Sequence, residues 1–519
     1  MTALAAAPIS NVRTGLAKDR LGVVAVTAQV IAAAAPLTVI AGGATAGLAI
    51  AQQRGMAIAY IAVAVILGIF ALPYVTMARQ LPNAGAFYVY VTAGLGRVAG
   101  AATAFVAILS YNAMQIGLYG GLGYEAHNVL ARYLHVNAPW WACALVGWLL
   151  VGIAGLLRVD FSARLLAWLL IGEIVVSAAF AGVQVAHPYQ GHVSFEVLSP
   201  SWLLIGSAGV MLTIAIAGFV GFENTTVFSE EARNARRTVP LATFIAIALI
   251  GTLYGFCVWA MSVNTGADNI VAQAGEQGTN LIFKLSEPFL PTFIVTIGHF
   301  LFVTSLFAAN LSFHNTSNRY FYAMGRDGLL PAVFGRTSQR TKSPVAASLL
   351  QSALALVVIS VYAITGWDPY VKLFFWLTAS AGLGVLTLMV LTSLAMLVYF
   401  WRQRSHRRRA AEIADTVRGI PDPDAPARHT VEPISAWRGL VAPVVAGILL
   451  TIILWQTVAN MHQLLGVAPT DNLRWYFPAA IPAFMLLGVV VALVLKTVRP
   501  DAYERIGNGV ARRPRGGAR

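Results

Sequence analysis

Residues 21–50 read LGVVAVTAQVIAAAAPLTVIAGGATAGLAI, a run without charged residues that is long enough to cross a bilayer as a helix. Pro36 stands in the middle of this run and is followed by Gly42 and Gly43. Proline has no backbone N–H to donate, and its ring clashes with the preceding turn of a helix. The sequence therefore predicts a membrane helix that is interrupted near Pro36.

A second stretch, 203–228, reads LLIGSAGVMLTIAIAGFVGFENTTVF and has Gly218 and Gly221 in its middle, followed by Glu223. It is the sixth apolar span, five spans after the first. Because five is odd, a second five-helix unit starts from the opposite face of the membrane, which is the geometry of an inverted repeat. Paired interrupted helices mark a midplane binding site, where freed amides hold carboxylates and freed carbonyls hold ammonium groups. The alternative is that Gly and Pro are simply common in membrane helices.

Apolar runs of this kind recur along almost the whole chain. Hydrophobic residues occupy 58% of the 519 positions and charged residues 11%, whereas soluble domains are close to a quarter charged. We therefore expect an all-α polytopic membrane protein with about twelve membrane helices, ten in two inverted repeats and two extra ones. The predicted spans are 21–49, 56–78, 98–123, 139–157, 163–186, 203–228, 240–263, 291–312, 344–365, 373–400, 438–461 and 475–497.

The net charge of +14 is distributed in a way that indicates topology rather than nucleic-acid binding. If the N-terminus is cytoplasmic, five of the 35 Lys and Arg residues fall on the external side and the other 30 on the cytoplasmic side. This bias follows the positive-inside rule, with attraction to anionic lipid as a second effect. We expect a multi-pass protein of the cytoplasmic membrane with both termini in the cytoplasm. The five external residues are Arg54, Arg132, Lys284, Lys372 and Arg474.

The segments outside the spans complete the expected organisation. Basic residues precede a first span that is far longer than a signal-peptide core, so this span is expected to remain as a helix. The proline-containing loop after the tenth span and the Arg/Gly-rich tail are expected to lack stable structure. The predicted parts are a cytoplasmic N-terminal segment (1–20), the first repeat (21–186), the second repeat (203–400), a cytoplasmic linker (401–437), helices eleven and twelve (438–497) and a basic cytoplasmic tail (498–519).

Four segments carry a resemblance to a known family. They are NAGAFYVYVTAGLG at 83–96, GFVGFE at 218–223 with EEARNARRTVP at 230–240, NRYFYAMGRDGLLP at 318–331, and the spacing of Pro36 from the start of the first span. Together they resemble the amino acid–polyamine–organocation (APC) permeases over the first ten spans. The resemblance implies two inverted five-helix repeats, as in the sodium-coupled leucine transporter, followed by two further helices. It also implies a bacterial amino acid permease.

The same resemblance implies a substrate site at the two interruptions and on the third span. Where many relatives have Gly-Ser-Gly, this chain has APLT at 35–38, so a substrate carboxylate must use the two amides after Pro36 or the threonine hydroxyl. Ala217 replaces a gating tryptophan of the arginine/agmatine antiporter, which predicts a wider site or a gating role for Phe219 or Phe222. The predicted substrate-binding residues are Ala35, Pro36, Leu37, Thr38, Asn112, Met114, Gln115, Ala217, Gly218, Phe219, Gly221 and Phe222.

Two carboxylates fall inside or at the edge of predicted spans, where a charged residue costs about 2.5–3.5 kcal/mol on insertion scales. By resemblance, Glu173 lies where sodium-independent relatives place a lysine that stands in for sodium, and a glutamate there can carry a proton instead. Glu223 matches a proton-sensing glutamate of the acid-resistance antiporter. Both are therefore candidates for proton coupling. The alternative for each is a hydrogen-bonded packing residue.

The third span carries Asn112, Gln115 and Tyr119 at i, i+3 and i+7, which forms one polar face on an apolar helix. Relatives line the substrate pocket with this span, so the face and the neighbouring Met114 are a second candidate site. The alternative is a hydrogen-bonded seam between helices. His314 in the eighth span is a further candidate for a proton role, or else a packing residue.

Other chemistries find little support in the sequence. A P-loop, a Cys/His cluster with metal-ligand spacing and a convergent nucleophile and base are all missing, so we expect no enzyme activity, no metal and no cofactor. Cys143 and Cys257 lie in apolar runs and are not expected to form a disulfide. The acidic pair 230–231 is expected to form ion pairs with the arginines of 233–237.

The sequence therefore predicts a secondary transporter of amino acids that works by alternating access, with proton symport as the expected coupling. Its expected partners are a small-molecule substrate, the lipid bilayer and the proton, and not nucleic acid. The alternatives are an amine or polyamine permease or an exchanger of the same fold, a channel, or a sensor that binds without transport. Glu223 is the only obvious counter-charge for a cation near the interruptions, and neutral amino acids fit equally well.

Overall fold

The computed structural model describes residues 15–157, 159–205, 208–417 and 435–507. In this part of the chain every regular element is a helix, and one isolated bridge joins Leu21 to Ala232. Eleven helices are long and apolar enough to cross a membrane. A twelfth, α7 (Trp140–Leu156), has 17 residues and lies where the fourth span was predicted. The all-α fold with about twelve spans is therefore confirmed.

The first repeat begins with the interrupted helix. α1 (Val23–Ala34) ends at Ala35, and the chain continues as α2 (Pro36–Thr38), the π-helical η1 (Val39–Ala44) and α3 (Thr45–Ala51). The interruption thus falls where Pro36 predicted it. The remaining helices are α4 (Met56–Gln80), the short α5 (Ala86–Leu95), α6 (Arg97–Leu134), α7 and α8 (Val159–Ala186).

The second repeat also begins with an interrupted helix, made of α9 (Ala208–Phe219) and η5 (Phe222–Thr225). Its other membrane helices are α10 (Ala235–Thr265), α13 (Thr292–Asp327), α14 (Val345–Thr365), and η7 (Pro369–Phe375) continued by α15 (Trp376–Val417). The loops carry η2 (Tyr189–Gly191), η3 (Glu196–Leu198), η4 (Pro200–Leu204), α11 (Ile270–Gln277), η6 (Gly278–Asn280) and α12 (Leu281–Ser286).

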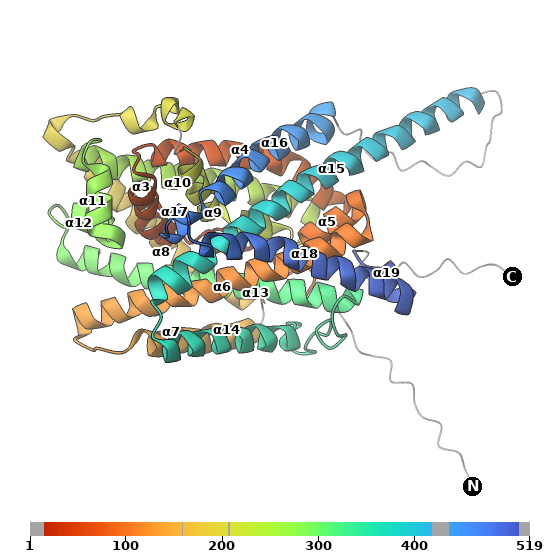
Figure 1. The fold of residues 1–519 in the computed structure, drawn as a ribbon, viewed down its shortest axis with the longest axis horizontal. Coiled ribbons are helices and arrows are strands. Elements are labelled where there is room, and N and C mark those ends of the chain that lie inside the picture. Colours follow the sequence, from red (N-terminus) through yellow and green to blue (C-terminus); the bar gives the residue numbers. More distant parts are fainter. Residues whose placement is uncertain (1–14, 158, 206–207, 418–434, 508–519) are drawn as a thin grey trace, which may run out of the picture.

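The C-terminal helices are η8 (Trp437–Val441), α16 (Ala442–Ala459), α17 (Met461–Leu465), α18 (Leu473–Val498) and α19 (Pro500–Arg505). The predictions that the linker and the tail lack stable structure are wrong for part of each segment. Residues 401–417 continue α15, which projects beyond the bundle in Figure 1. The tail forms α19, held by the buried Ala502 and Ile506. The remaining expectations for 1–14, 418–434 and 508–519 lie outside the described residues.

The loops gather at two ends of the bundle. We call the end with α5 and α19 the N-terminal side, because residues 15–21 bond to loops there, and the end with α11 and α12 the opposite side (Figure 1). Between these ends α6 packs against α13, α15 and α18. A Cβ at Gly120 would overlap the backbone of Pro369, which shows how glycine lets α6 and η7 approach closely. α6 therefore runs through the centre of the fold.

Candidate functional site

The two interrupted helices touch at their interruptions. Ala35 has a left-handed conformation with φ of 47°, and Pro36 starts the next helical segment. Gly221 has φ of 120°, and a Cβ on it would lie 2.5 Å from the Cβ of Ala33. Both the backbone conformation and the contact therefore require glycine at position 221. The two breaks that Pro36 and the glycines predicted thus lie against each other near the middle of the bundle.

A cavity of about 120 Å³ lies beside these interruptions. Its lining comes from the first and sixth spans together with α6, α13, η7, α15 and the end of the eleventh span. It reaches toward the opposite side, where Ile50 and Leu464 contribute to the wall. None of the described lining residues is charged, and the polar ones are four threonines, Thr38, Thr213, Thr378 and Thr457. The cavity is therefore an apolar chamber whose other polar groups belong to the backbone at the interruptions.

The cavity brings together five of the twelve predicted substrate-binding residues, namely Ala35, Thr38, Met114, Ala217 and Gly218. Ala217 faces α15, where a Cβ on Gly382 would lie 3.3 Å from the Ala217 Cβ. No large side chain at either position fills this part of the chamber. The geometry is therefore compatible with the wider site that Ala217 predicted.

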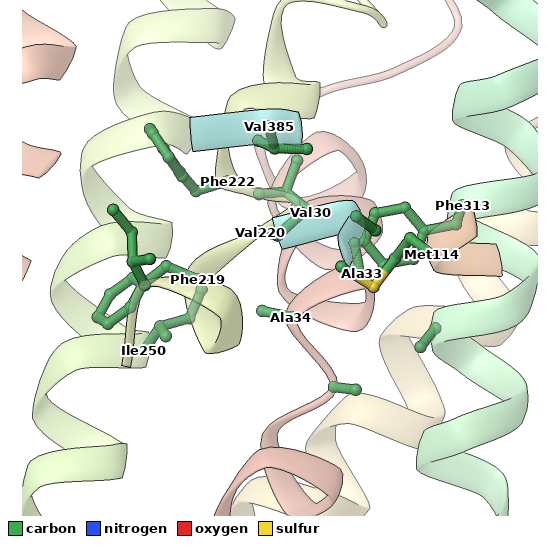
Figure 2. Close-up of a cluster of buried hydrophobic side chains, with 14 of the residues drawn as sticks. Val30, Ala33, Ala34, Met114, Phe219, Val220, Phe222, Ile250, Phe313 and Val385 are labelled. Atoms are coloured by element: carbon green, nitrogen blue, oxygen red, sulfur yellow. The ribbon is translucent and has the colours of Figure 1, made fainter. Parts of the chain in front are cut away.

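The other seven predicted residues do not line the cavity. Phe219 packs against Tyr254 with ring centroids 5.9 Å apart, and Figure 2 shows it turned away from Met114. Phe222 lies edge-on to Phe70 at 6.2 Å. In this conformation both rings are part of the packing around α4 and α10 rather than walls of the chamber. The seven are Pro36, Leu37, Asn112, Gln115, Phe219, Gly221 and Phe222.

The polar face of α6 points toward two other helices. Gln115 Nε2 donates to the Tyr119 hydroxyl at 3.0 Å and lies 3.3 Å from His314 Nδ1, and Gln351 of α14 donates to Gln115 Oε1. Asn112 donates to a carbonyl one turn back in its own helix at 2.8 Å. The bonds of Gln115 correspond to a hydrogen-bonded seam between helices, the alternative to a substrate-binding face, whereas the bond of Asn112 stays within α6.

Glu173 is buried against the first interruption. Its Oε2 accepts hydrogen bonds from the Ser305 hydroxyl at 2.7 Å and from the Leu37 amide at 3.4 Å. Ser305 Oγ in turn accepts from the Thr38 amide at 3.3 Å and the Thr38 hydroxyl at 3.0 Å. The two amides after Pro36, which were predicted to receive a substrate carboxylate, therefore already bond to the protein's own side chains. The same contacts join α8, α13 and the interrupted helix.

Glu223 is placed at the second interruption in a comparable way. Its Oε2 accepts from the Gly221 amide at 2.9 Å, and its Oε1 accepts from the Tyr111 hydroxyl at 2.8 Å. The start of a helical segment carries free N–H groups and the positive end of the helix dipole, both of which favour a carboxylate. Glu173 and Glu223 thus cap the second halves of the two interrupted helices, and neither lines the cavity.

The N-terminal side of the bundle is closed. Val30, Val220, Phe313 and Val385 form part of a buried hydrophobic cluster at the interruptions, shown in Figure 2. This cluster separates the cavity from the loops of the N-terminal side.

Two ion pairs brace the same side beyond the hydrophobic cluster. Arg319 pairs with Glu231 at 2.6 and 3.1 Å, with exposed side-chain fractions of 4% and 2%. Arg326 pairs with Glu230 at 2.9 and 3.0 Å. The predicted partners at 233–237 are therefore wrong for these two contacts. The loop folds onto the end of α13. Arg319 and Arg326, which are 88 and 96 residues away in the sequence, therefore lie beside the two glutamates.

Three residues of this site were missed by the sequence reasoning. Ser305 bonds to Glu173, Tyr111 bonds to Glu223, and Tyr254 donates to the Ala34 carbonyl at 2.7 Å. Each is an uncharged polar residue in a mostly apolar span that also carries other polar residues. The available signal was its position opposite an interruption, which becomes visible only when the helices are packed together.

The comparisons with known proteins agree with this architecture. The family model described as "amino acid permease" matches residues 21–495. The low-affinity putrescine importer PlaP of Escherichia coli (strain K12) is 22% identical over 346 residues, which are 64% of this chain and 70% of PlaP. The branched-chain amino acid permease BcaP of Lactococcus lactis is 24% identical over 316 residues, which are 55% of this chain and just under two thirds (64%) of BcaP.

An animal relative and a solved structure extend the comparison. Human cationic amino acid transporter 4 is 25% identical over 313 residues, covering 56% of this chain and 47% of that protein. The manganese transporter of Eremococcus coleocola, a transporter with the leucine-transporter fold, superposes with a TM-score of 0.53 at 11% identity, covering 96% of this chain and 99% of the other. At that identity the likeness concerns the fold alone. Because the family match spans nearly the whole sequence, this chain belongs to the amino acid permease family within the APC superfamily.

Proposed function

We propose that this protein is a secondary transporter that carries an amino acid or a closely related amine across the cytoplasmic membrane by alternating access, coupled to inward proton movement. The family and the transporter fold support the general class. The bias of Lys and Arg toward the N-terminal side supports a cytoplasmic position for that side and for both termini. The substrate binds in the cavity at the interruptions, which five of the twelve predicted residues line.

Alternating access requires that the cavity open to one side at a time. The cavity leads toward the opposite side, whereas hydrophobic side chains and ion pairs close the N-terminal side. Opening of the N-terminal side requires α1 to separate from η5 and α13, since these elements pack against it there. The arrangement is therefore that of one state in such a cycle.

The observation that carries the proton-coupling proposal is the position of Glu173. An ionised carboxylate only accepts hydrogen bonds, and Glu173 accepts from both Leu37 and Ser305. Both bonds go to Oε2, and protonation of the carboxyl group weakens them, because hydrogen bonds to an ionised acceptor are about twice as strong as bonds to a neutral one. The charge on Glu173 is thereby linked to the contact between α8, α13 and the second half of the first span. Tyr254 and Cys257 of α10 are the titratable groups that pack on the same region.

The test is uptake of labelled amino acids and amines into proteoliposomes, with and without an inward proton gradient. Symport predicts saturable uptake that the gradient accelerates. Glu173→Gln should abolish that acceleration, because glutamine keeps the shape of the side chain and cannot take up a proton. Glu223→Gln neutralises the other candidate for proton coupling, and the acceleration should persist in this variant because Glu173 carries the proton.

Other results would redirect the assignment. Uptake that ignores the gradient but rises with substrate inside the vesicles would identify an exchanger and remove the coupling role of Glu173. Binding without any flux would identify a sensor. Flux that does not saturate and shows no counterflow would identify a channel.

A further inference from the structure

We infer that the cavity takes a protonated monoamine, a molecule with one ammonium group, an apolar body and no carboxylate. This inference rests on the proposed function and names the substrate class of the same site. The family itself leaves the class open, because the relatives above include a putrescine importer, a branched-chain amino acid permease and a cationic amino acid transporter. The chemistry of this particular chamber distinguishes among them.

The donors freed by Pro36 and Gly221 are already occupied, which disfavours a substrate carboxylate at these positions. Proline at position 36 has no N–H, the Leu37 amide donates to Glu173, and the Thr38 amide and hydroxyl both donate to Ser305. At the second interruption the Gly221 amide donates to Glu223. No Lys, Arg or His is among the described residues that line the chamber. The positive ends of both second-half helices are thus neutralised by the protein, and a buried carboxylate without donors is strongly disfavoured.

An ammonium group, in contrast, finds free acceptors. The first halves of both interrupted helices, α1 and α9, end at the cavity, and each presents the carbonyl groups and the negative end of a helix dipole. Pro36 has no N–H, and the amides of Leu37 and Thr38 donate to side chains, so these groups leave the Ala33 carbonyl without its usual helical partner. Ala33 lines the cavity, as does Gly218 in the last turn of α9. One ammonium group between these two helix ends satisfies the Ala33 carbonyl and faces the negative ends of both helix dipoles.

The rest of the chamber suits an apolar body. Phe313, Phe374 and Phe375 contribute aromatic walls, and the threonine hydroxyls of Thr213 and Thr378 already donate to carbonyls of their own helices. A volume of 120 Å³ is well above the roughly 10–15 Å³ that a single water needs, so the chamber has room for a small alkyl or aryl amine. A diamine such as putrescine would place its second ammonium group against these walls without a counter-charge, since Glu173 and Glu223 lie outside the lining.

The test compares three ligands in equilibrium binding to the purified full-length protein, which avoids the passive leak of free amines across vesicles. 3-Methylbutylamine is leucine without its carboxylate, so the two form a matched pair, and putrescine adds a second ammonium group. We expect 3-methylbutylamine to bind at least tenfold more tightly than leucine and at least tenfold more tightly than putrescine. Tighter binding of leucine or of putrescine would overturn the inference while leaving a transporter in place. Binding of none of the three would overturn the inference, and absence of gradient-driven uptake across the wider panel would separately overturn the proposed function.

A pair of variants tests the same chemistry by gain of binding. Thr378 lines the cavity and Thr387 does not, although both lie on α15 and both donate to a carbonyl one turn back, at 2.7 and 2.9 Å. Thr378→Asp adds a carboxylate to the chamber and should raise the affinity for putrescine at least tenfold. Thr387→Asp should leave it unchanged. Equal effects of the two substitutions, or no gain of affinity from Thr378→Asp in a folded protein, would contradict the inference. They would show that the second ammonium group of putrescine does not lie against the cavity wall near Thr378.

Discussion

Removal of the charge on Glu231 should release the closure of the N-terminal side. Glu231 and Arg319 form a two-bond pair at 2.6 and 3.1 Å, and both side chains are almost fully buried. Loss of one partner of a buried pair leaves an uncompensated charge and costs about 3–5 kcal/mol. Opening of this side brings water to Arg319, so the cost falls on the closed state. Since each 1.4 kcal/mol is a factor of ten, Glu231→Gln should shift the equilibrium toward the open state at least about 100-fold.

The assay is the rate at which a membrane-impermeant thiol reagent labels Val30→Cys from the N-terminal side. Val30 belongs to the buried hydrophobic cluster, so its labelling reports opening. Cys143 and Cys257 are both buried and free, and they are replaced by alanine to give a silent background. Glu231→Gln should increase the labelling rate at least tenfold.

The matched control is the ion pair between Arg54 and Glu196 on the opposite side, at 2.9 Å with exposed side-chain fractions of 29% and 49%. Exposed pairs contribute about 0–1 kcal/mol, so Glu196→Gln should change the labelling of Val30→Cys less than about fivefold. Unchanged labelling in a folded Glu231→Gln variant would refute the role of the buried pair. An equal increase with Glu196→Gln would show that general destabilisation, and not release of this closure, is responsible.

Two further substitutions test the packing of the N-terminal side through the melting temperature of the purified protein. Gly94→Ala should lower the melting temperature, because the new Cβ would overlap the backbone of Ala395 and overpacking costs about 1–3 kcal/mol. Gly68→Ala is the control: no atom lies within 4 Å of the new Cβ, so the melting temperature should be unchanged or slightly higher. Tyr88→Phe should also lower the melting temperature, because it removes a 2.9 Å hydrogen bond to the buried Asp327 that is worth about 1.5–3 kcal/mol. Burial raises the pKa of the Tyr88 phenol well above its usual range, so this hydrogen-bond donor persists at alkaline pH. A melting temperature of Gly94→Ala equal to that of Gly68→Ala, or no change in Tyr88→Phe, would contradict these contacts.

Features that depend on local covalent chemistry could be predicted from the sequence. Pro36 lacks an amide hydrogen wherever it is placed, so the first interruption followed from one residue. The spans followed from hydropathy and length, because the bilayer imposes both. The prediction that 401–417 lacks stable structure is wrong because polarity does not exclude a helix. Arg, Ala and Glu are good helix formers, and they extend α15 through this polar segment.

Features that depend on which helices meet could not be predicted in the same way. The arginines nearest to Glu230 and Glu231 in sequence are not their partners, because the fold brings the end of α13 to the loop. The Leu37 amide was correctly identified as a group freed by Pro36, but its partner is on α8. Sequence therefore showed which groups are freed at the interruption, and the tertiary packing determined what they bind.

The buried carboxylates lie outside the cavity, so proton coupling and substrate preference can be altered by different substitutions. Glu173 lies behind the wall of the cavity, bonded to Leu37 and Ser305, whereas Thr378 and Ala217 face the chamber itself. With the proton on Glu173 and the substrate in the cavity, the two bind at neighbouring but separate sites. Each influences the other through the position of the interrupted first helix. Substitutions in the chamber should therefore change which molecule binds without uncoupling it from the gradient. Substitution of Glu173 should uncouple transport without changing the order of preference among ligands, because the chamber's walls and free carbonyls remain as they are.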